Sequence, residues 1–475
     1  MFLRIRAMRV LTLASAFGLP ASAMAAPASQ LGQLETVPST SASPAAAPAS
    51  RPSSAARPAT VATPAKPAAS TAAQPAATPA PPVVVPVPIT LMQWNVADAQ
   101  ALLSYIEGID EEGLIPADYK PDELRAAIEA GPGPALDEAA SRSFTWLAED
   151  LRDGRTPMTS RVQWFAVDPD QDNNPTSAIM TKALQTHDVA GTLTGLDPTY
   201  PDYQVLKDAL AATPSTAKAR RALIQINMDR WRWLPRELGL IYLITNVPEF
   251  ELRLATNQRI VRTYRTIVGK PGKTATPQLA EKVEAVVFNP TWTVPQSIVQ
   301  GEGLGARLLR RPSPEYKVTK SADGTINVVQ QPGPTNSLGL MKIDMPNPHA
   351  IYLHDTPNRN LFNAPAPRAF SHGCVRTENA QMLGMTMAMM GAGLTVDQAV
   401  AYANSGKYTK VPMTTTFPVY ITYFTMAQDI TGKLSSFNDI YGRDAPVLAS
   451  FARPRELKTT QRKSNEAIIK LDNPL

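Results

Sequence analysis

The spacing of apolar residues changes near residue 237, and this change restricts the chain to a mixed architecture. Between residues 91 and 234, apolar side chains recur every three or four positions, which is typical of amphipathic helices. After Gly239, apolar and polar residues alternate in the segments 240–247, 250–254 and 260–268. Such alternation predicts successive antiparallel strands joined by short turns. We therefore predict an α+β protein, in which a helical domain precedes a mostly antiparallel β domain.

The N-terminal segments have compositions that exclude a packed core. Residues 1–25 combine three arginines, a short apolar run and small residues, which is the pattern of a cleaved export signal. An uncleaved anchor is the alternative, although the run of about ten residues is far shorter than the ~20 that span a bilayer. Residues 26–88 are rich in Pro, Ala, Ser and Thr, which predicts an extended tether. We expect an exported protein of the periplasm.

Removal of these segments leaves roughly 385 residues, enough for two domains. We predict a helical scaffold domain over 89–236, a catalytic domain over 237–445 and a C-terminal tail over 446–475. Within the catalytic domain, residues 295–331 carry many charges and few strand signals. A segment of that length is typically functional in a compact domain, and we interpret it as a flap or capping insertion over the site.

The charge pattern argues against several classes of partner and cofactor. The net charge is +5, but no aromatic-interleaved groove or nucleic-acid motif accompanies the basic clusters, so we interpret them as solvated helix faces. The histidines at 349, 354 and 372 are too scattered for a zinc site, and no phosphate-binding glycine loop is present. We expect no metal, no cofactor and no nucleic acid.

The only cysteine, Cys374, lies in the segment Ser371-His372-Gly373-Cys374-Val375-Arg376. A lone cysteine in an exported protein cannot form an internal disulfide, so it is either filler or a reactive thiol. Twenty residues upstream, His354 ends an apolar alternating run. An imidazole held by a strand can take the thiol proton and return it to a leaving amine. We predict that Cys374 is a nucleophile and His354 its acid/base.

The neighbouring residues suggest supporting roles. Asp355 could orient His354 through its carbonyl or its side chain. Gly373 permits a tight turn in which the amides of Gly373 and Cys374 face a developing oxyanion. Arg376 could hold a substrate carboxylate by a bidentate contact, or form a structural ion pair. His372 should point along the loop rather than at the sulfur.

Several motifs of this chain resemble those of the L,D-transpeptidases with a YkuD-type catalytic domain, in particular the YcbB-like branch. They are Arg230–Pro235, Asn289–Pro295, Gly333–Lys342, Ile351–Pro357 and Arg368–Arg376. The resemblance implies a β-sandwich catalytic domain beside a helical scaffold domain, with helices after the nucleophile. It also implies Cys374 as nucleophile and His354 as acid/base. Among the motif residues, we expect these to contact substrate: Arg376, His372, Ser371, Tyr352, Asn336 and Trp292.

One departure concerns the small peptidoglycan-binding module of the YcbB-like branch. Only Leu210–Thr216 occupies the corresponding place here, so we expect the module to be missing. The resemblance implies an exported, carbapenem-sensitive enzyme that cross-links peptidoglycan stem peptides through a cysteine thioester. It leaves two products open, diaminopimelate–diaminopimelate and L-alanine–diaminopimelate, with D-amino-acid exchange or L,D-carboxypeptidase side activity. The alternatives are a non-catalytic envelope scaffold and a sortase-like protein transpeptidase.

Overall fold

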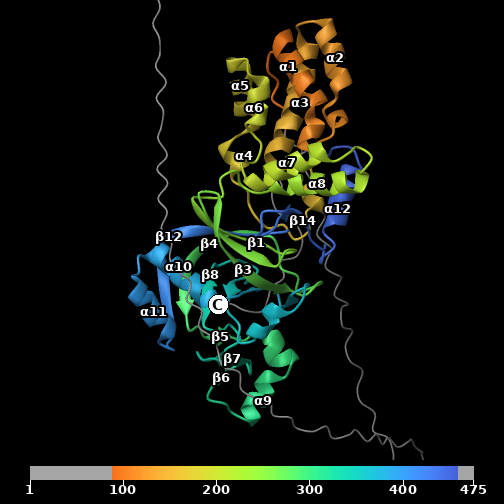
Figure 1. Cartoon of the computed structure of the whole chain (residues 1–475). Helices are drawn as coiled ribbons and strands as arrows, with labels where there is room; N and C mark the ends of the chain where they lie inside the picture. Colours follow the sequence, from red (N-terminus) through yellow and green to blue (C-terminus); the bar gives the residue numbers. More distant parts are fainter. Residues whose placement is uncertain (1–87, 458–475) are drawn as a thin grey trace, which may run out of the picture. The chain divides into compact units, whose positions relative to one another are not determined.

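The structure, a computed structural model, describes residues 88–457 of the 475-residue chain. The expected signal peptide, all but the last residue of the expected tether, and residues 458–475 lie outside the described residues. As predicted, a helical region precedes a mostly β region (Figure 1). No helix within 88–457 has both the length and the apolarity needed to cross a membrane.

The helical region is organised around a buried core that includes Leu102, Phe144 and Met180. Its first helix begins at Asn95, whose side chain accepts a hydrogen bond from the Asp98 amide and so satisfies an N–H that a helix start leaves open. The helices are α1 (Val96–Glu107), α2 (Pro121–Ala130), α3 (Pro134–Asp153), α4 (Asp170–Asn173), α5 (Thr176–Thr186), α6 (Val189–Thr194), α7 (Pro201–Ala212) and α8 (Lys218–Trp231).

The β region contains a nine-stranded sheet in the order β10-β3-β11-β9-β8-β4-β12-β1-β2. Because β2 also pairs with β3, the sheet closes on itself. One face carries the apolar core, which includes Leu243, Leu252, Leu353 and Val375. The strands are β1 (Ile241–Asn246), β2 (Glu251–Thr256), β3 (Arg259–Gly269), β4 (Leu279–Phe288), β8 (Met341–Asp344), β9 (Leu353–His354), β10 (Ala369–Ser371), β11 (Val375–Thr377) and β12 (Thr409–Thr422).

The first three strands pair antiparallel in chain order, which confirms the prediction made from their alternation. The strand β12, in contrast, pairs parallel with β1, and β11 pairs parallel with β9. The helices predicted after Cys374 are α10 (Ala380–Ala392) and α11 (Val396–Asn404). Leu383 and Met387 of α10 pack into the core of the sheet.

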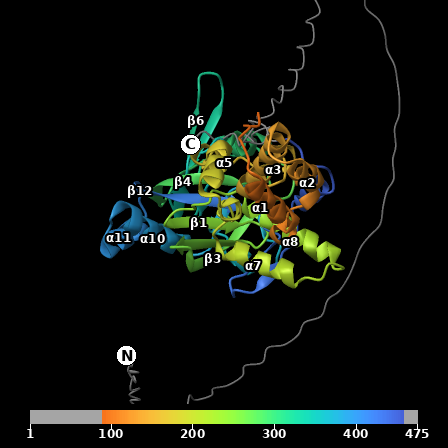
Figure 2. The same cartoon turned by 90° about the horizontal axis from the view of Figure 1, so that it is seen from above.

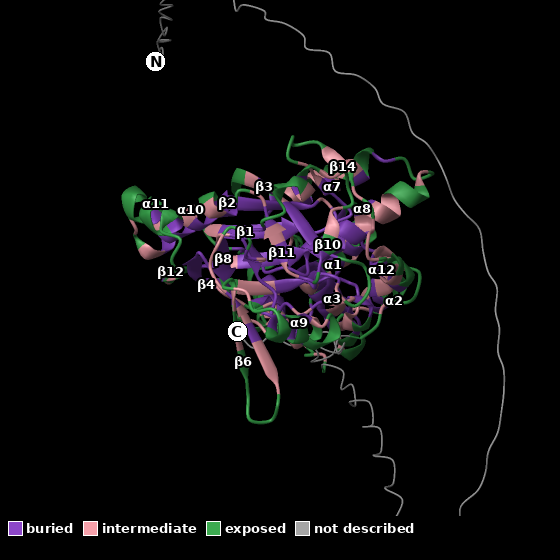
Figure 3. Ribbon diagram, turned by 90° about the horizontal axis from the view of Figure 1, so that it is seen from below, coloured by how far each residue is buried: buried purple, intermediate pink, exposed green. Residues whose placement is uncertain are grey.

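The segment 295–331 has more regular structure than the sequence indicated. A turn of π-helix at Ser297–Gly301 and α9 (Leu304–Arg310) precede β6 (Tyr316–Lys320) and β7 (Ile326–Gln330). These two strands form a small sheet with β5 (Trp292–Thr293) around a separate apolar cluster. The β6–β7 hairpin extends away from the main sheet (Figure 2), and its tip is exposed (Figure 3).

The segment after residue 440 returns to the helical region rather than ending as a detached tail. The hairpin of β13 (Met426–Gln428) and β14 (Leu434–Ser436) leads to α12 (Asp444–Phe451). Arg155 donates hydrogen bonds to the carbonyls of Ser450 and Arg453, each at 2.7 Å. Arg455 forms ion pairs of 2.9 Å with Glu149 and Asp150 of α3. The described end of the chain is therefore held by the helices.

Candidate active site

Strand register places a row of polar side chains on one face of the closed sheet. In β8, Lys342 is the register partner of His354 in β9, and His354 is in turn the partner of Arg376 in β11. Register partners project from the same face, as do residues two positions apart along a strand. Tyr352 and Cys374 therefore lie on the face that carries Lys342, His354 and Arg376. The opposite face holds Leu353 and Val375 in the apolar core.

Cys374 is half-buried, and its thiol approaches the Ala350 carbonyl, with 3.6 Å between Sγ and the oxygen. Ala350 adopts a φ of +52°, a region that non-glycine residues rarely occupy. Burial raises the pKa of Cys374 to about 11, although hydrogen bonds from Tyr352 and the charges of Lys342 and Arg376 act in the opposite direction. The thiol is therefore protonated at neutral pH in this state, and it needs a base.

His354 is buried, and its Nδ1 has no hydrogen-bond partner in the structure. Burial, followed by the charge of Arg376, lowers the pKa of His354 to about 3, against the opposing effect of the Asp355 and Leu338 backbone. The ring is therefore neutral at pH 7 and able to accept a proton. The Asp355 carboxylate does not orient this ring, because it accepts from the Leu340 amide at 2.9 Å and from Arg359 at 3.1 Å. The orienting role expected for the Asp355 carbonyl stays a prediction.

The loop before Cys374 is fixed by its own hydrogen bonds. Ser371 Oγ donates to the Cys374 carbonyl at 2.6 Å and accepts from the Gly373 amide at 3.1 Å. Thr276 Oγ1 donates to the Gly373 carbonyl at 2.8 Å. Gly373 has a φ of +123°, which L-residues rarely adopt. The Gly373 amide, predicted to be one of two oxyanion donors, thus already has an acceptor, and the hydroxyl of Ser371, predicted to contact substrate, forms hydrogen bonds within the loop.

Arg376 and His372 retain freedom to bind a ligand. Within residues 88–457, the guanidinium of Arg376 forms no ion pair, and its Nε is buried without a hydrogen-bond partner. The structural ion pair considered from the sequence is therefore absent from the described part of the chain. His372 is exposed and lies beside His349 at a small cavity next to the loop, consistent with a ring that points along the loop.

The side chain of Asn336, predicted to contact substrate, forms hydrogen bonds within the protein. It is fully buried, and its side-chain amide donates to the carbonyls of Pro290 at 3.0 Å and Gln331 at 2.9 Å. Its side-chain oxygen accepts from the Leu338 amide at 2.8 Å. With these contacts the amide group has little capacity left for a ligand. Trp292 is half-buried between the main core and the small β5–β7–β6 cluster.

The sequence reasoning missed the role of a charged pair beside the site. Lys342 lies with its ammonium 4.7 Å from the centroid of the Tyr352 ring, and the Tyr352 and His354 ring centroids are 5.6 Å apart. Asp344 pairs with Lys342 at 3.2 Å and with Lys410 at 2.7 Å. The available signal was Lys342 itself, a cation in the middle of the otherwise apolar stretch 340–343, since buried lysines are rare without a partner.

Comparisons with known proteins match both regions of the chain. Residues 241–387 match the YkuD family, described as the L,D-transpeptidase catalytic domain, and residues 93–210 match the Scaffold domain. A curated protein of Haemophilus influenzae, "Putative L,D-transpeptidase", is 29% identical over 243 residues, which are 47% of this chain and 48% of that protein. The chain thus spans about half the length of this curated relative.

Solved structures with some similarity are L,D-transpeptidases as well. The Mycobacterium smegmatis enzyme is 12% identical, over 38% of this chain and 58% of that one, with a TM-score of 0.21. An L,D-transpeptidase in complex with imipenem is 15% identical, over 38% and 59%, with a TM-score of 0.20. Mycobacterium tuberculosis L,D-transpeptidase 1 is 14% identical, over 38% and 61%, with a TM-score of 0.18. TM-scores this low carry no argument about the site.

Proposed function

This chain carries a YkuD-type L,D-transpeptidase catalytic domain, and we propose that it cross-links peptidoglycan stem peptides through a thioester on Cys374. The sulfur attacks the carbonyl of an L,D-peptide bond in a donor stem, a carbon–sulfur bond forms, and the carbon–nitrogen bond breaks. The D-amino acid leaves as an amine that receives its proton from His354. An amine of a second stem then attacks the thioester, a new amide forms, and the thiol is restored.

The observation that carries this proposal is the shared sheet face of Cys374, His354 and Arg376. Parallel register aligns His354 with Arg376, and Cys374 lies two residues before Arg376 on the same face. The base and the anion-binding cation are therefore presented by two adjacent strands, β9 and β11, and the nucleophile by the hydrogen-bonded loop directly before β11. Such a framework holds reacting groups in a productive geometry before substrate arrives.

The charges around the row suggest how substrate binding activates the pair. In the free protein, the positive charge of Arg376 lowers the pKa of His354. A substrate carboxylate bound to Arg376 would neutralise that charge, so the pKa of His354 would rise and the ring would become a better base. The thiol proton would then move to His354 as the carbon–sulfur bond forms, and only when a donor is in place.

The positive charges of Arg376 and Lys342 favour a donor stem peptide that has a free carboxylate close to the scissile bond. Diaminopimelate offers such a carboxylate, and we propose it as the residue attacked in the donor. Both products considered from the sequence remain within the proposal: a diaminopimelate–diaminopimelate link, or an L-alanine–diaminopimelate link if the sulfur instead attacks the bond after the first stem residue. Water or a free D-amino acid as acceptor would give carboxypeptidase or exchange activity. The periplasm is the proposed compartment, because residues 1–25 have the pattern of an export signal.

A carbapenem tests the proposed nucleophile, because its strained lactam opens to a thiolate and leaves an acyl group on the sulfur. Intact-mass spectrometry of the full chain should show one added drug molecule at neutral pH, and none in Cys374→Ala. His354→Gln should acylate at least about 100-fold more slowly, since a general base typically contributes 10²–10⁴-fold. A wild-type chain without adduct would support the non-catalytic scaffold alternative. Mass spectrometry of muropeptides after incubation with isolated sacculi would identify the linkage.

A further inference from the structure

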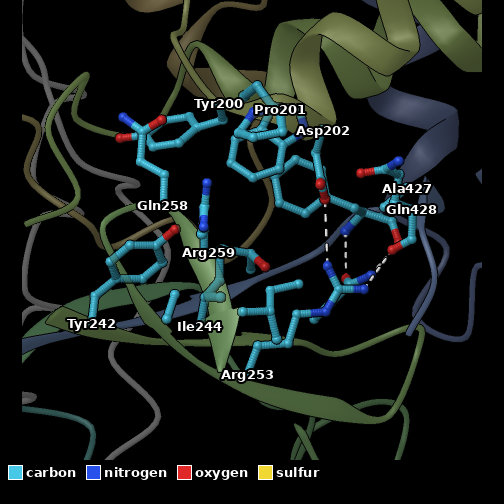
Figure 4. A pocket seen from close by; sticks show the side chains of 16 residues that line it. Tyr200, Pro201, Asp202, Tyr242, Ile244, Arg253, Gln258, Arg259, Ala427 and Gln428 are labelled. Carbon is cyan, nitrogen blue, oxygen red and sulfur yellow. Dashed lines mark hydrogen bonds and ion pairs between the residues drawn. The ribbon is translucent and has the colours of Figure 1, made fainter. Parts of the chain in front are cut away.

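A cavity of about 270 Å³ lies between α7 and the sheet, on the outer face of β1 and β2 (Figure 4). Tyr242 and Ile244 of β1 and Arg253 of β2 form one side, and Tyr200 with Asp202 closes the other. The volume is just under the ~300–1,000 Å³ typical of sites for drug-sized ligands, so it suits a single ring. The row of polar side chains at the candidate active site, which consists of Lys342, His354, Arg376 and the adjoining Tyr352 and Cys374 (the catalytic row), does not line this cavity.

Three aromatic rings in mutual contact form the apolar wall of the cavity. The ring centroids of Tyr200 and Trp231 are 5.1 Å apart, and Trp231 stacks on Phe424 at 4.5 Å with an interplanar angle of 22°. Trp231 and Phe424 are both at least nine-tenths buried. Apolar C–H faces of a ligand pack favourably against aromatic side chains of this kind.

The same wall contains polar atoms that lack partners. Trp231 Nε1 and Arg253 Nε are buried, and neither has a hydrogen-bond partner in the structure. Both side chains line the cavity and are less than a tenth exposed. Buried donors are normally satisfied by protein, water or ligand. The polar side chains that line the cavity, among them Asp202, Gln258 and Arg259, together with the apolar wall suit a ligand that offers both apolar faces and hydrogen-bonding oxygens.

The buried charges at the cavity are paired with one another, which argues against a strongly ionic ligand. Arg253 forms ion pairs with Asp202 at 3.4 Å and with Glu249 at 2.8 Å, and its guanidinium also donates to the Gln428 carbonyl. At the rim, Arg259 supplies a second cation next to exposed Gln258. The lining itself carries two cations and one carboxylate, because Glu249 lies outside it, and its planar amide and guanidinium groups suit hydroxyl and acetamido oxygens.

We propose that this cavity binds one N-acetylated amino-sugar ring of a glycan strand. The proposal rests on the proposed function, since a peptidoglycan substrate brings such rings to the protein. The cavity would also supply a sugar contact that this chain otherwise lacks. Its helices α7 and α8 are joined by residues 213–217 alone, at the place where the YcbB-like branch carries a small peptidoglycan-binding module.

The position of the cavity relative to the catalytic row fits a sugar-linked stem. Arg253 pairs with Thr263 of β3, and Arg376 pairs with Ile267 of the same strand. The two arginines are thus two strands apart on one face, about 10 Å across the sheet and about 13 Å along it, or on the order of 16 Å. A stem of three or four extended residues spans about 10–14 Å, and the side chains cover the remainder.

The test measures binding of chitotetraose, an N-acetylglucosamine tetramer without stem peptides, to the purified full chain. Calorimetry and quenching of tryptophan fluorescence should show saturable binding at concentrations below about 10 mM, and cellotetraose, which lacks the acetamido groups, should bind more weakly. The double variant Gln258→Ala/Arg259→Ala, which alters only exposed rim residues, should lose about 3–10-fold in affinity for each hydrogen bond removed. Lys282→Ala, an exposed change on β4, should bind as the wild type does.

Carbapenem acylation of Cys374 is measured on the same samples, so that the two proposals fail separately. If all variants acylate normally and the wild type binds no chitotetraose, the sugar site is refuted while the proposed function stands. Equal binding by the wild type and the rim variant would also refute this site. If chitotetraose binds with the expected variant pattern and no acylation occurs, the sugar site stands and the cysteine mechanism fails.

Discussion

His354 and Arg376 are register partners on the parallel strands β9 and β11, so the imidazole and the guanidinium project side by side from one face. The arginine charge lowers the pKa of the histidine, and burial lowers the pKa of the arginine. An anion bound at Arg376 would oppose the effect of the arginine charge, so the pKa of His354 would rise. This relationship links substrate binding to the basicity of the catalytic ring.

Arg376→Gln separates these two effects. Loss of a charge-assisted contact with the donor carboxylate should lower kcat/KM about 10–100-fold. The pKa of His354 in the free enzyme should rise, because a nearby positive charge is removed. The acidic limb of the kcat/KM–pH profile should therefore move to higher pH. Arg262→Gln, an exposed change on β3, is the control. If the acidic limb does not move in Arg376→Gln, the charge of Arg376 does not control the pKa of His354.

Lys342→Met tests the charge that stabilises the thiolate. Lys342 is one of the cations that lower the pKa of Cys374 against the effect of burial, so the pKa of Cys374 should rise in the variant. Carbapenem acylation at pH 7 should slow, and its rise with pH should move to higher pH. Lys410→Met is a matched control, because Lys410 also pairs with Asp344 but is about half exposed. Equal slowing in both variants would assign the effect to Asp344 instead.

Local sequence signals were sufficient for the order of the helical and β regions, whereas the roles of Cys374 and His354 stay predictions. The alternation that predicted β1, β2 and β3 is a local property, and so is their antiparallel pairing through short turns. The closure of the sheet is not local: β12 inserts beside β1 in parallel, although about 160 residues separate the two strands. No periodicity within either strand carries that information.

The supporting residues of the site were harder to predict for a similar reason. Asp355 follows His354 directly, and adjacent strand residues point to opposite faces, which is why its carboxylate reaches Leu340 and Arg359 instead of the ring. Lys342 and Asp344 belong to another strand, β8, and only the register with β9 brings Lys342 beside His354. Proximity in sequence to His354 therefore suggested a wrong contact for the Asp355 carboxylate. It gave no information about Lys342 and Asp344.

Asn336→Ala should impair folding rather than substrate binding. The change removes the donors to the carbonyls of Pro290 and Gln331 and the acceptor for Leu338, all in a buried environment. We expect the free energy of unfolding to fall by about 2–4 kcal/mol, measured by urea denaturation. KM of the remaining folded enzyme should be unchanged. Asn327→Ala, which loses one exposed hydrogen bond to Ser321, should change stability by less than about 0.5 kcal/mol. A raised KM in Asn336→Ala would instead support the substrate contact that the sequence analysis predicted for this residue.

Arg455→Met tests whether the C-terminal segment holds the helical region. The side chain of Arg455 is 3% exposed and lies between Glu149 and Asp150, and Asp150 is fully buried. Removal of the cation leaves two buried carboxylates without it, which typically costs about 3–5 kcal/mol. Arg453→Met removes an exposed arginine two residues earlier, whose side chain contacts only the Ala449 carbonyl, and should have little effect.

A compensating change distinguishes this ionic role from a loss of packing. In the triple variant Glu149→Gln/Asp150→Asn/Arg455→Met, neutral amides replace the two carboxylates, so the electrostatic cost of removing the arginine charge disappears while the loss of the arginine side chain remains. Chemical denaturation should show that the triple variant is more stable than Arg455→Met alone. If the two variants unfold at the same denaturant concentration, Arg455 acts through packing against Trp146, whose ring centroid lies 5.4 Å from the guanidinium carbon, and not through the ion pairs.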